Sequence, residues 1–189
     1  FVHGALLGAG LRDGIRLIAS GRILTGFHMI RAMALGADLC MTARGMMFAL
    51  GCVQSLRCNS GLCPTGVTST DPTLVRGLAV ADKAPRIERF HHATVHSLLD
   101  MLCAMGLTHP SEIRPHHVFR RVDDLRVRHF GEVYDYLRRD QLIEDDAVPE
   151  DLRSQWHAAS ADTWRMKTGE EAGLHGRPSL RTDSGRGPA

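Results

Sequence analysis

Two short aliphatic runs in the first half of the chain have the pattern of buried strands. Residues 15–19 are β-branched or aliphatic apart from one arginine and end at Ser20, and residues 37–42 form a second short run. Runs of this length with little alternation are typical of parallel strands covered on both sides. We therefore expect two strands that are buried on both faces.

One segment with helical spacing lies between the two predicted strands, and a second follows them. Phe27, Ile30 and Ala34 lie three and four residues apart, and the predicted helix runs from Thr25 to a glycine stop at Gly36. A second, shorter helix is expected over residues 45–50. The order strand, helix, strand, helix predicts one βαβα unit of a parallel sheet and an α/β fold class.

The second half of the chain begins with a longer helical pattern. Residues 85–105 predict a packing helix that ends at Gly106. Its apolar stripe comprises Ile87, Phe90, Thr94, Leu98, Met101 and Met105. Residues 111–115 are expected to form a polar connector, and residues 118–137 are charged with scattered apolar positions. From about residue 166 the chain is rich in Gly, Arg, Ser and Pro, so a disordered tail is predicted.

The candidate chemistry lies in three closely spaced cysteines. Cys52, Cys58 and Cys63 form a Cys-x5-Cys-x4-Cys run, and a turn is expected where Pro64 follows the last of them. Three thiolates at one point favour an iron-sulfur cluster, whereas structural zinc requires four ligands and neither Cys40 nor Cys103 is suitably spaced. A disulfide with one free thiol, or three unrelated small residues, remains the alternative.

Small residues follow both predicted strands and suggest an anion site. One turn contains Ser20, Gly21 and Arg22, and the other contains Ala43 and Arg44. Backbone N–H groups in such turns approach a ligand closely, and a helix N-terminus adds the positive end of its dipole. The loops after strands seven and eight of (β/α)8 barrels bind phosphate repeatedly. The alternative is that the glycines only make tight turns.

Composition narrows the class of protein. The chain has 189 residues, 43% of them hydrophobic, which is enough for one ordinary domain. Five cysteines without a secretory signal favour a reducing compartment, with the cytoplasm as the default location. Apolar runs such as residues 32–37 are far shorter than the ~20 residues of a membrane span. Seven arginines against three aspartates over residues 1–80 suit a phosphate-bearing ligand but are too few to indicate nucleic acid.

The histidines provide no clear catalytic group. His28 lies early in a predicted helix and is interpreted as a solvated helix residue. Of the remaining histidines we considered, only His92 and His96 have helical i, i+4 spacing, and no matching carboxylate motif accompanies them. The set considered as surface or helix-end residues is His91, His92, His96, His109, His116 and His117. No residue is a good candidate for acid-base catalysis.

Several stretches together resemble a known family, the FMN-binding glutamate synthase family, and the resemblance extends from residue 1 to about residue 122. They are Gly10-Leu11-Arg12-Asp13, the sequence from Ile18 to Gly26, Ala34-Leu35-Gly36-Ala37-Asp38, and the sequence from Gly51 through the three cysteines to Thr68. The resemblance implies the C-terminal portion of a (β/α)8 TIM barrel that binds FMN. Strands 7 and 8 would be residues 15–19 and 37–42, and a cysteine loop with a three-iron, four-sulfur (3Fe-4S) cluster would follow.

The same resemblance implies roles for individual residues. Cys52, Cys58 and Cys63 would ligate the cluster. The backbone of Ser20, Gly21, Arg22, Ala43 and Arg44 would hold the FMN phosphate, although Arg44 departs from the more glycine-rich turn of larger glutamate synthases. The implied domains are the barrel portion over residues 1–122, a helical extension over 123–165 and a disordered tail over 166–189. Strands one to six of a barrel of ~250 residues would be missing, and with them the catalytic groups.

Two classes of function follow. The first is an oxidoreductase fragment that forms L-glutamate from 2-oxoglutarate and an ammonia donor. Its electron donor would be NAD(P)H through a flavoprotein subunit, or ferredoxin. The second is a non-catalytic cluster-binding remnant or subunit that needs a partner chain, such as the missing N-terminal barrel half. Neither class involves nucleic acid or a membrane.

Overall fold

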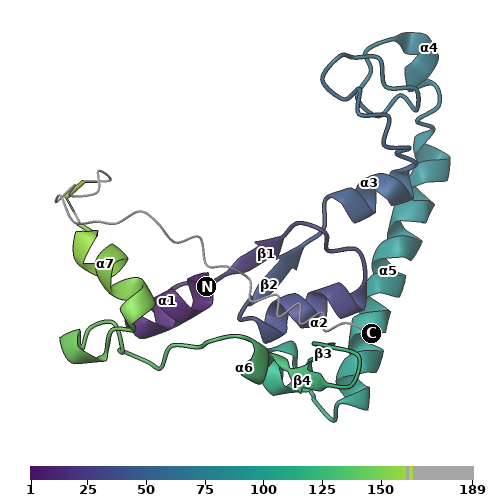
Figure 1. Ribbon diagram of the computed structural model, residues 1–189. Helices are drawn as coiled ribbons and strands as arrows, with labels where there is room; N and C mark the ends of the chain where they lie inside the picture. The colour runs from purple at the N-terminus through teal and green to yellow at the C-terminus, as the bar shows by residue number, and fades with distance from the viewer. Residues whose placement is uncertain (161, 164–189) are drawn as a thin grey trace, which may run out of the picture. The chain divides into compact units, whose positions relative to one another are not determined.

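The computed structural model describes residues 1–160, 162 and 163, and the predicted tail over residues 166–189 lies outside them. The chain divides into two compact units, residues 1–140 and residues 141–189. The elements of the first unit are α1 (Val2–Gly8), η1 (Arg12–Gly14), β1 (Ile18–Ser20), α2 (Gly26–Ala34), β2 (Leu39–Met41), α3 (Arg44–Leu50), α4 (Pro72–Val75), α5 (Val80–Ala104), η2 (Pro110–Glu112), η3 (Pro115–His117), β3 (Phe119–Arg121), β4 (Val127–His129) and α6 (Phe130–Val133) (Figure 1). The second unit contains η4 (Asp145–Ala147) and α7 (Glu150–Ala158).

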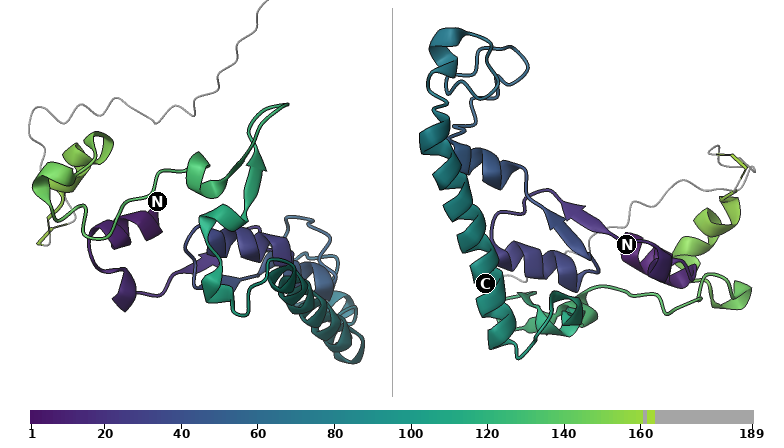
Figure 2. Two further views of the ribbon diagram at one scale, coloured as in Figure 1. Left: turned by 90° about the horizontal axis from the view of Figure 1, so that it is seen from below. Right: turned by 180° about the vertical axis from the view of Figure 1, so that it is seen from behind.

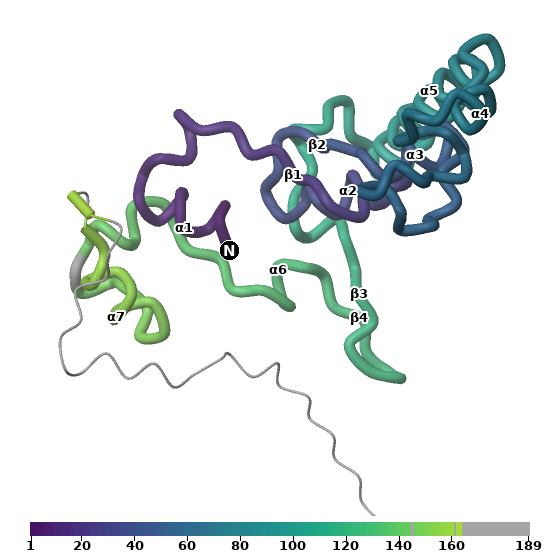
Figure 3. The backbone as a smooth tube through the Cα atoms, turned by 90° about the horizontal axis from the view of Figure 1, so that it is seen from above, coloured from purple at the N-terminus to yellow at the C-terminus, as the bar shows by residue number. Residues whose placement is uncertain are grey.

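The predicted βαβα unit is present as β1, α2, β2 and α3. The two strands pair in parallel, with Ile18 opposite Leu39 and Ser20 opposite Met41, and they lie side by side in Figure 3. The Thr25 hydroxyl accepts a hydrogen bond from the His28 N–H and caps α2, as expected of a threonine at this position. The α/β class and the order of the elements are confirmed.

Helix α2 lies between the strand pair and α5. Figure 2 shows α5 passing alongside α2 and α3, and contacts with both helices agree with this view. The buried core contains Ile30 and Ala34 of α2, Leu98 and Leu102 of α5, and the later residues Ile113, Val118 and Phe130. The C-terminal part of the predicted stripe, Leu98, Met101 and Met105, therefore faces this core. Ile113 is only 4% exposed, so the predicted polar connector over residues 111–115 also contributes a core residue.

Only one face of the β1–β2 pair is covered by the described residues. The Cys40 thiol approaches the Met29 carbonyl of α2 at 3.9 Å, so Cys40 faces the helix. Side chains alternate along a strand, and Ile18, Leu39 and Met41 therefore point to the opposite face. Their exposed fractions are 56%, 55% and 55%. The sequence predicted strands that are buried on both faces. Within the described residues only one face is buried.

A β-hairpin lies within residues 118–137, which the sequence analysis described only as charged with scattered apolar positions. Strands β3 and β4 are antiparallel, with Arg120 opposite Arg128. The Asp123 carboxylate accepts bonds from the N–H groups of Leu125 and Arg126 and closes the turn. The hairpin crosses residue 122, and the structure places β4 ahead of α6 and α7 in the stretch proposed as a helical extension. The sequence-based domain limits stay a prediction.

The second unit has its own local contacts. The Gln141 side chain donates to the Ala147 carbonyl at 3.0 Å, and the Arg153 side chain donates to the Val148 carbonyl at 3.3 Å. Arg153 also pairs with Glu150 at 2.6 Å within α7. None of the described helices of either unit is long and apolar enough to cross a membrane.

Close packing at Gly26 provides a test of the α2–α5 contact. A Cβ atom at this position would lie 2.6 Å from the Leu98 backbone nitrogen and 2.9 Å from the Ser97 carbonyl carbon. We expect Gly26→Ala to lower the free energy of unfolding by about 1–3 kcal/mol, because overpacking against backbone outweighs the gain of at most ~1 kcal/mol in helix propensity. Gly14→Ala is the control, since nothing lies within 4 Å of its Cβ position. Equal stability of the two variants in urea unfolding would refute the contact.

The open apolar face predicts self-association of the isolated chain. Burial of a leucine side chain contributes roughly 1.5–3 kcal/mol, so Leu39→Lys is expected to weaken association about tenfold or more. Val75→Lys is the matched control, because Val75 is an exposed valine on α4. Light scattering over a concentration series measures both. A monodisperse wild-type monomer with cooperative melting would contradict the prediction.

Candidate functional site

The turns after β1 and β2 lie at the same edge of the sheet. Because the strands are parallel, their carboxyl ends meet there. The Thr42 hydroxyl, just after β2, donates to the carbonyl of Ile23, which follows the first turn. Ile23 is buried, with 7% exposure. This bond joins the two turns, and neither Thr42 nor Ile23 was singled out from the sequence, since a single threonine after a strand carries no distinctive pattern.

The five predicted phosphate-binding residues form an exposed edge. They are Ser20, Gly21, Arg22, Ala43 and Arg44. Gly21 and Arg22 have positive φ angles of 89° and 57°, so the first turn is left-handed at two consecutive residues. Glycine adopts this conformation readily, whereas arginine at φ above zero is uncommon and is often found at binding sites. The structure thus brings the two predicted turns to one edge and keeps their backbone open.

Gly45 explains how α3 starts so close to this edge. A Cβ atom on Gly45 would lie 2.6 Å from the Thr42 hydroxyl oxygen and 3.1 Å from the Phe90 ring of α5. A larger residue would therefore push α3 away from α5 and disturb the Thr42 bond. The His28 Nδ1 atom accepts the Leu24 N–H at 3.3 Å, which holds the ring at the start of its own helix. It is half-buried and stabilises its own helix start, rather than being the solvated residue expected.

The three cysteines lie on an irregular segment between α3 and α4. Cys52 is half-buried, Cys58 is exposed and Cys63 is buried, and all three are free thiols. Figure 1 shows this segment with α4 at the N-terminal end of α5. Among the described residues, no three His, Cys, Asp or Glu side chains are arranged to hold a metal ion. In the chain, the cysteine segment follows α3, which itself begins shortly after β2. Convergence of the three sulfurs on one point stays a prediction.

Cys63 lies in a turn that stabilises its thiolate. The Gly66 N–H donates to the Cys63 carbonyl at 3.1 Å, which forms the turn expected from the sequence. The Thr65 hydroxyl lies 3.3 Å from the Cys63 sulfur. Bonds from that hydroxyl and from the backbone N–H groups of Thr68, Thr65 and Val67 lower the pKa of Cys63 to about 6. Thiolates are the form that binds metals, so this environment suits a metal ligand.

Further contacts hold the cysteine segment in place. A Cβ atom on Gly66 would lie 2.2 Å from the Leu74 carbonyl oxygen, so the turn is packed directly against α4. The Gln54 N–H approaches the Cys52 sulfur at 3.5 Å. The Lys83 amino group lies 3.7 Å from the Cβ position of Gly51, next to Cys52. Lys83 was missed because it is 31 residues from that cysteine in the chain, and only the fold brings it there.

Comparison with known proteins identifies the family. Residues 1–108, more than half of the chain, match the family described as "Conserved region in glutamate synthase". The chain belongs to the glutamate synthase family. The resemblance noted from the motifs is therefore confirmed. No solved structure matched the chain.

The glutamate synthase relatives are considerably longer than the matched region. The chain is 38% identical to the Glutamate synthase large subunit-like protein YerD of Bacillus subtilis over 115 residues, which are 61% of this chain and 22% of that protein. It is 36% identical to the Archaeal glutamate synthase (NADPH) of Methanocaldococcus jannaschii over 105 residues, 56% of this chain and 21% of that protein. The match thus spans about a fifth of the length of these relatives.

The low pKa of Cys63 gives a pH-dependent prediction. The folded pKa of about 6 lies below the ordinary value of 9.0, so the folded state loses its proton first as the pH rises. The stability of the metal-free, reduced chain should therefore increase from pH about 6 to about 9 and be lost as the pH falls through 6. Thr65→Val should raise the pKa, whereas Thr68→Val should not, because Thr68 contributes only its backbone N–H.

Ultraviolet absorbance of the thiolate, titrated in the two variants and in Cys63→Ser, measures this directly. The low-pH titration step should disappear in Cys63→Ser and move to higher pH in Thr65→Val. A step that is unchanged in both Cys63→Ser and Thr65→Val would show that Cys63 is not the group involved.

Proposed function

We propose that this chain forms the C-terminal part of the FMN-binding (β/α)8 barrel of a glutamate synthase-type oxidoreductase, with β1 and β2 as strands seven and eight. The enzyme would form L-glutamate from 2-oxoglutarate and an ammonia donor. The observation that carries the proposal is the order of the elements. Two parallel strands end at one edge of the sheet, α3 follows the second strand, and the cysteine segment follows α3. Active sites of such barrels lie at the carboxyl ends of the strands.

The two faces of the strand pair support the barrel assignment. In a (β/α)8 barrel the helices cover the outside, and the inward residues fill the centre. Helix α2 covers the Cys40 face, which would be the outside. The exposed Ile18, Leu39 and Met41 would then point into the barrel interior, where side chains from the other strands would cover them.

The proposed cofactor contacts use the exposed edge and the cysteines. The backbone N–H groups at Gly21 and Arg22 and those at Ala43 and Arg44 would bind the phosphate of FMN, with the arginine side chains adding positive charge. Cys52, Cys58 and Cys63 would ligate a 3Fe-4S cluster. When bound, FMN supplies hydride transfer and the cluster supplies one-electron transfer. The N–H groups that surround the Cys63 sulfur would stabilise negative charge on it.

The substrates and electron donor belong to the whole protein and are proposed on family grounds. The names of the archaeal and archaeal-type relatives include NADPH, which favours NADPH over ferredoxin as the electron source of this chain. The sequence offers no good candidate for acid-base catalysis, and Nδ1 of His28 is engaged with the start of its own helix. The catalytic groups would therefore come from the remainder of the barrel.

Substitution of single cysteines tests the proposal. After anaerobic reconstitution with ferrous iron and sulfide, Cys52→Ser, Cys58→Ser and Cys63→Ser should each lose most of the bound iron and sulfide, because a cluster with three protein thiolates has no spare ligand. Cys103→Ser should retain both, since Cys103 is an exposed residue on α5.

Iron and sulfide analysis of each variant, together with circular dichroism to confirm folding, provides the measurement. Full iron content in any of the three loop variants would refute the assignment, as would loss of iron from a folded Cys103→Ser protein. The same four substitutions in a full-length relative would give the corresponding result for glutamate formation.

A further inference from the structure

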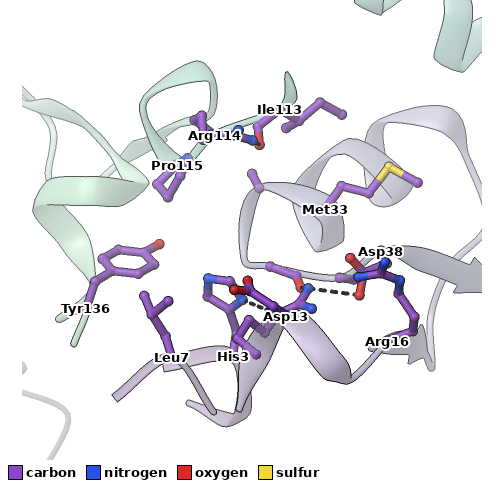
Figure 4. A pocket seen from close by; sticks show the side chains of 14 residues that line it. His3, Leu7, Asp13, Arg16, Met33, Asp38, Ile113, Arg114, Pro115 and Tyr136 are labelled. Atoms are coloured by element: carbon purple, nitrogen blue, oxygen red, sulfur yellow. Dashed lines mark hydrogen bonds and ion pairs between the residues drawn. The ribbon is translucent and has the colours of Figure 1, made fainter. Parts of the chain in front are cut away.

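A second candidate binding site lies at the amino ends of the same strands. A cleft of about 470 Å³ is lined by residues of α1, η1, the α2–β2 turn and the η2–η3 region, together with Tyr136 (Figure 4). Arg16 precedes β1 and Asp38 precedes β2, so the cleft lies at the end of the sheet opposite the turns at Gly21 and Ala43. It is therefore separate from the site proposed for FMN. Its volume falls within the range of small-molecule sites.

Both carboxylates of the cleft are already engaged. Asp38 accepts bonds from the Arg12 guanidinium at 2.8 Å and from the Leu17 N–H at 2.7 Å, and these bonds hold the pKa of Asp38 below its usual value. Asp13 accepts two bonds from Arg139, at 2.8 Å and 3.0 Å, which lower its pKa as well. Both groups are therefore ionised and paired at neutral pH, and neither is available to hold a cationic ligand.

The groups that remain are hydrogen-bond donors. The His3 Nδ1 atom lies 2.9 Å from Arg12 Nε, and since arginine is always protonated, Nδ1 must be the acceptor. The proton of neutral His3 is consequently on Nε2. Burial, followed by the nearby charge of Arg12, lowers the pKa of His3, so this neutral form prevails at pH 7. Within the described residues, the guanidinium of Arg16 has no hydrogen bond or ion pair, and its charge acts on Asp13 and Asp38 without such a contact.

Two further donors, the Arg114 guanidinium and the Tyr136 hydroxyl, and an apolar wall complete the cleft. The Nη1 group of Arg114 donates hydrogen bonds to the carbonyls of Ser111 and Ile113. Its other guanidinium N–H groups have no partner in the described part of the chain. Figure 4 shows Tyr136 across the cleft from Arg16, with His3 between them. Three arginines against two aspartates leave the lining positively charged, while Met33, Ile113 and Pro115 provide apolar contact.

We propose that this cleft binds a small organic carboxylate, with its anionic end at the arginine-lined wall and its carbon body against Met33, Ile113 and Pro115. An anion satisfies donors that otherwise have no partner, whereas a cation finds both acids occupied. The apolar wall favours an organic anion over inorganic phosphate, which has no carbon body to bury.

Methyl NMR of the full chain, with ¹³C-labelled methionine, tests the proposal with glutarate as the probe. Glutarate should shift the Met33 methyl resonance saturably and leave Met46, on α3, unchanged. Arg16→Gln should weaken glutarate binding about tenfold or more, as expected for loss of a charged hydrogen bond. Arg31→Gln, which removes an exposed arginine of α2 outside the cleft, should bind glutarate as the wild type does.

Two small molecules serve as controls for the ligand chemistry. Glutaramide has a similar shape without charge and should not bind, and inorganic phosphate should bind more weakly than glutarate. Equilibrium dialysis with labelled glutarate gives the same comparison if the methyl resonances overlap. The proposal fails if glutarate does not bind, if Arg16→Gln binds it unchanged, or if glutaramide or phosphate binds as tightly.

Discussion

The packing of α2 between the β1–β2 pair and α5 is the contact on which the rest of the first unit depends. It requires a glycine at the first residue of α2, because Leu98 and Ser97 leave no space for a side chain there. Ile30 and Ala34 then meet Leu98 and Leu102 in the core. Since the helix covers one face of the strands, the same contact determines which side chains face away from it. The parallel pairing of the strands places their carboxyl ends and the two turns on one edge.

The uncovered face is the main consequence of that arrangement. A two-stranded sheet is marginal on its own, and three exposed apolar side chains on its open side would be costly in water. The relatives in the glutamate synthase family are longer, and the matched region covers about a fifth of them. An account in which other strands of the same barrel cover this face explains both observations.

The sequence predicted the elements whose signals are local. The strand and helix order over residues 15–50, and the stripe of α5, follow from periodicity and glycine stops that lie within each segment. The β3–β4 hairpin was not predicted, because charged side chains such as Arg120 and Arg128 hide the alternation of its strands. The role of Ile113 was missed for a related reason, since a single apolar residue within a polar connector has no pattern.

The candidate site was predictable in its residues but less so in its geometry. The cysteine spacing and the two turns are sequence features, and the structure places the turns together through the Thr42 bond. Contacts between distant residues, such as Lys83 beside Gly51 or Arg12 with Asp38, depend on the fold and have no local signature. Where the three sulfurs lie relative to one another depends in addition on the group that they are proposed to bind.

The proposed three-iron cluster can be detected by electron paramagnetic resonance of the anaerobically purified wild-type protein. Three ferric ions together carry an odd number of unpaired electrons, so a cluster with three irons must be paramagnetic in its oxidised state. Our account predicts such a signal in the oxidised protein, with about three irons for each chain. A protein that contains no iron, or whose oxidised cluster gives no signal as expected for an even number of irons, would contradict it.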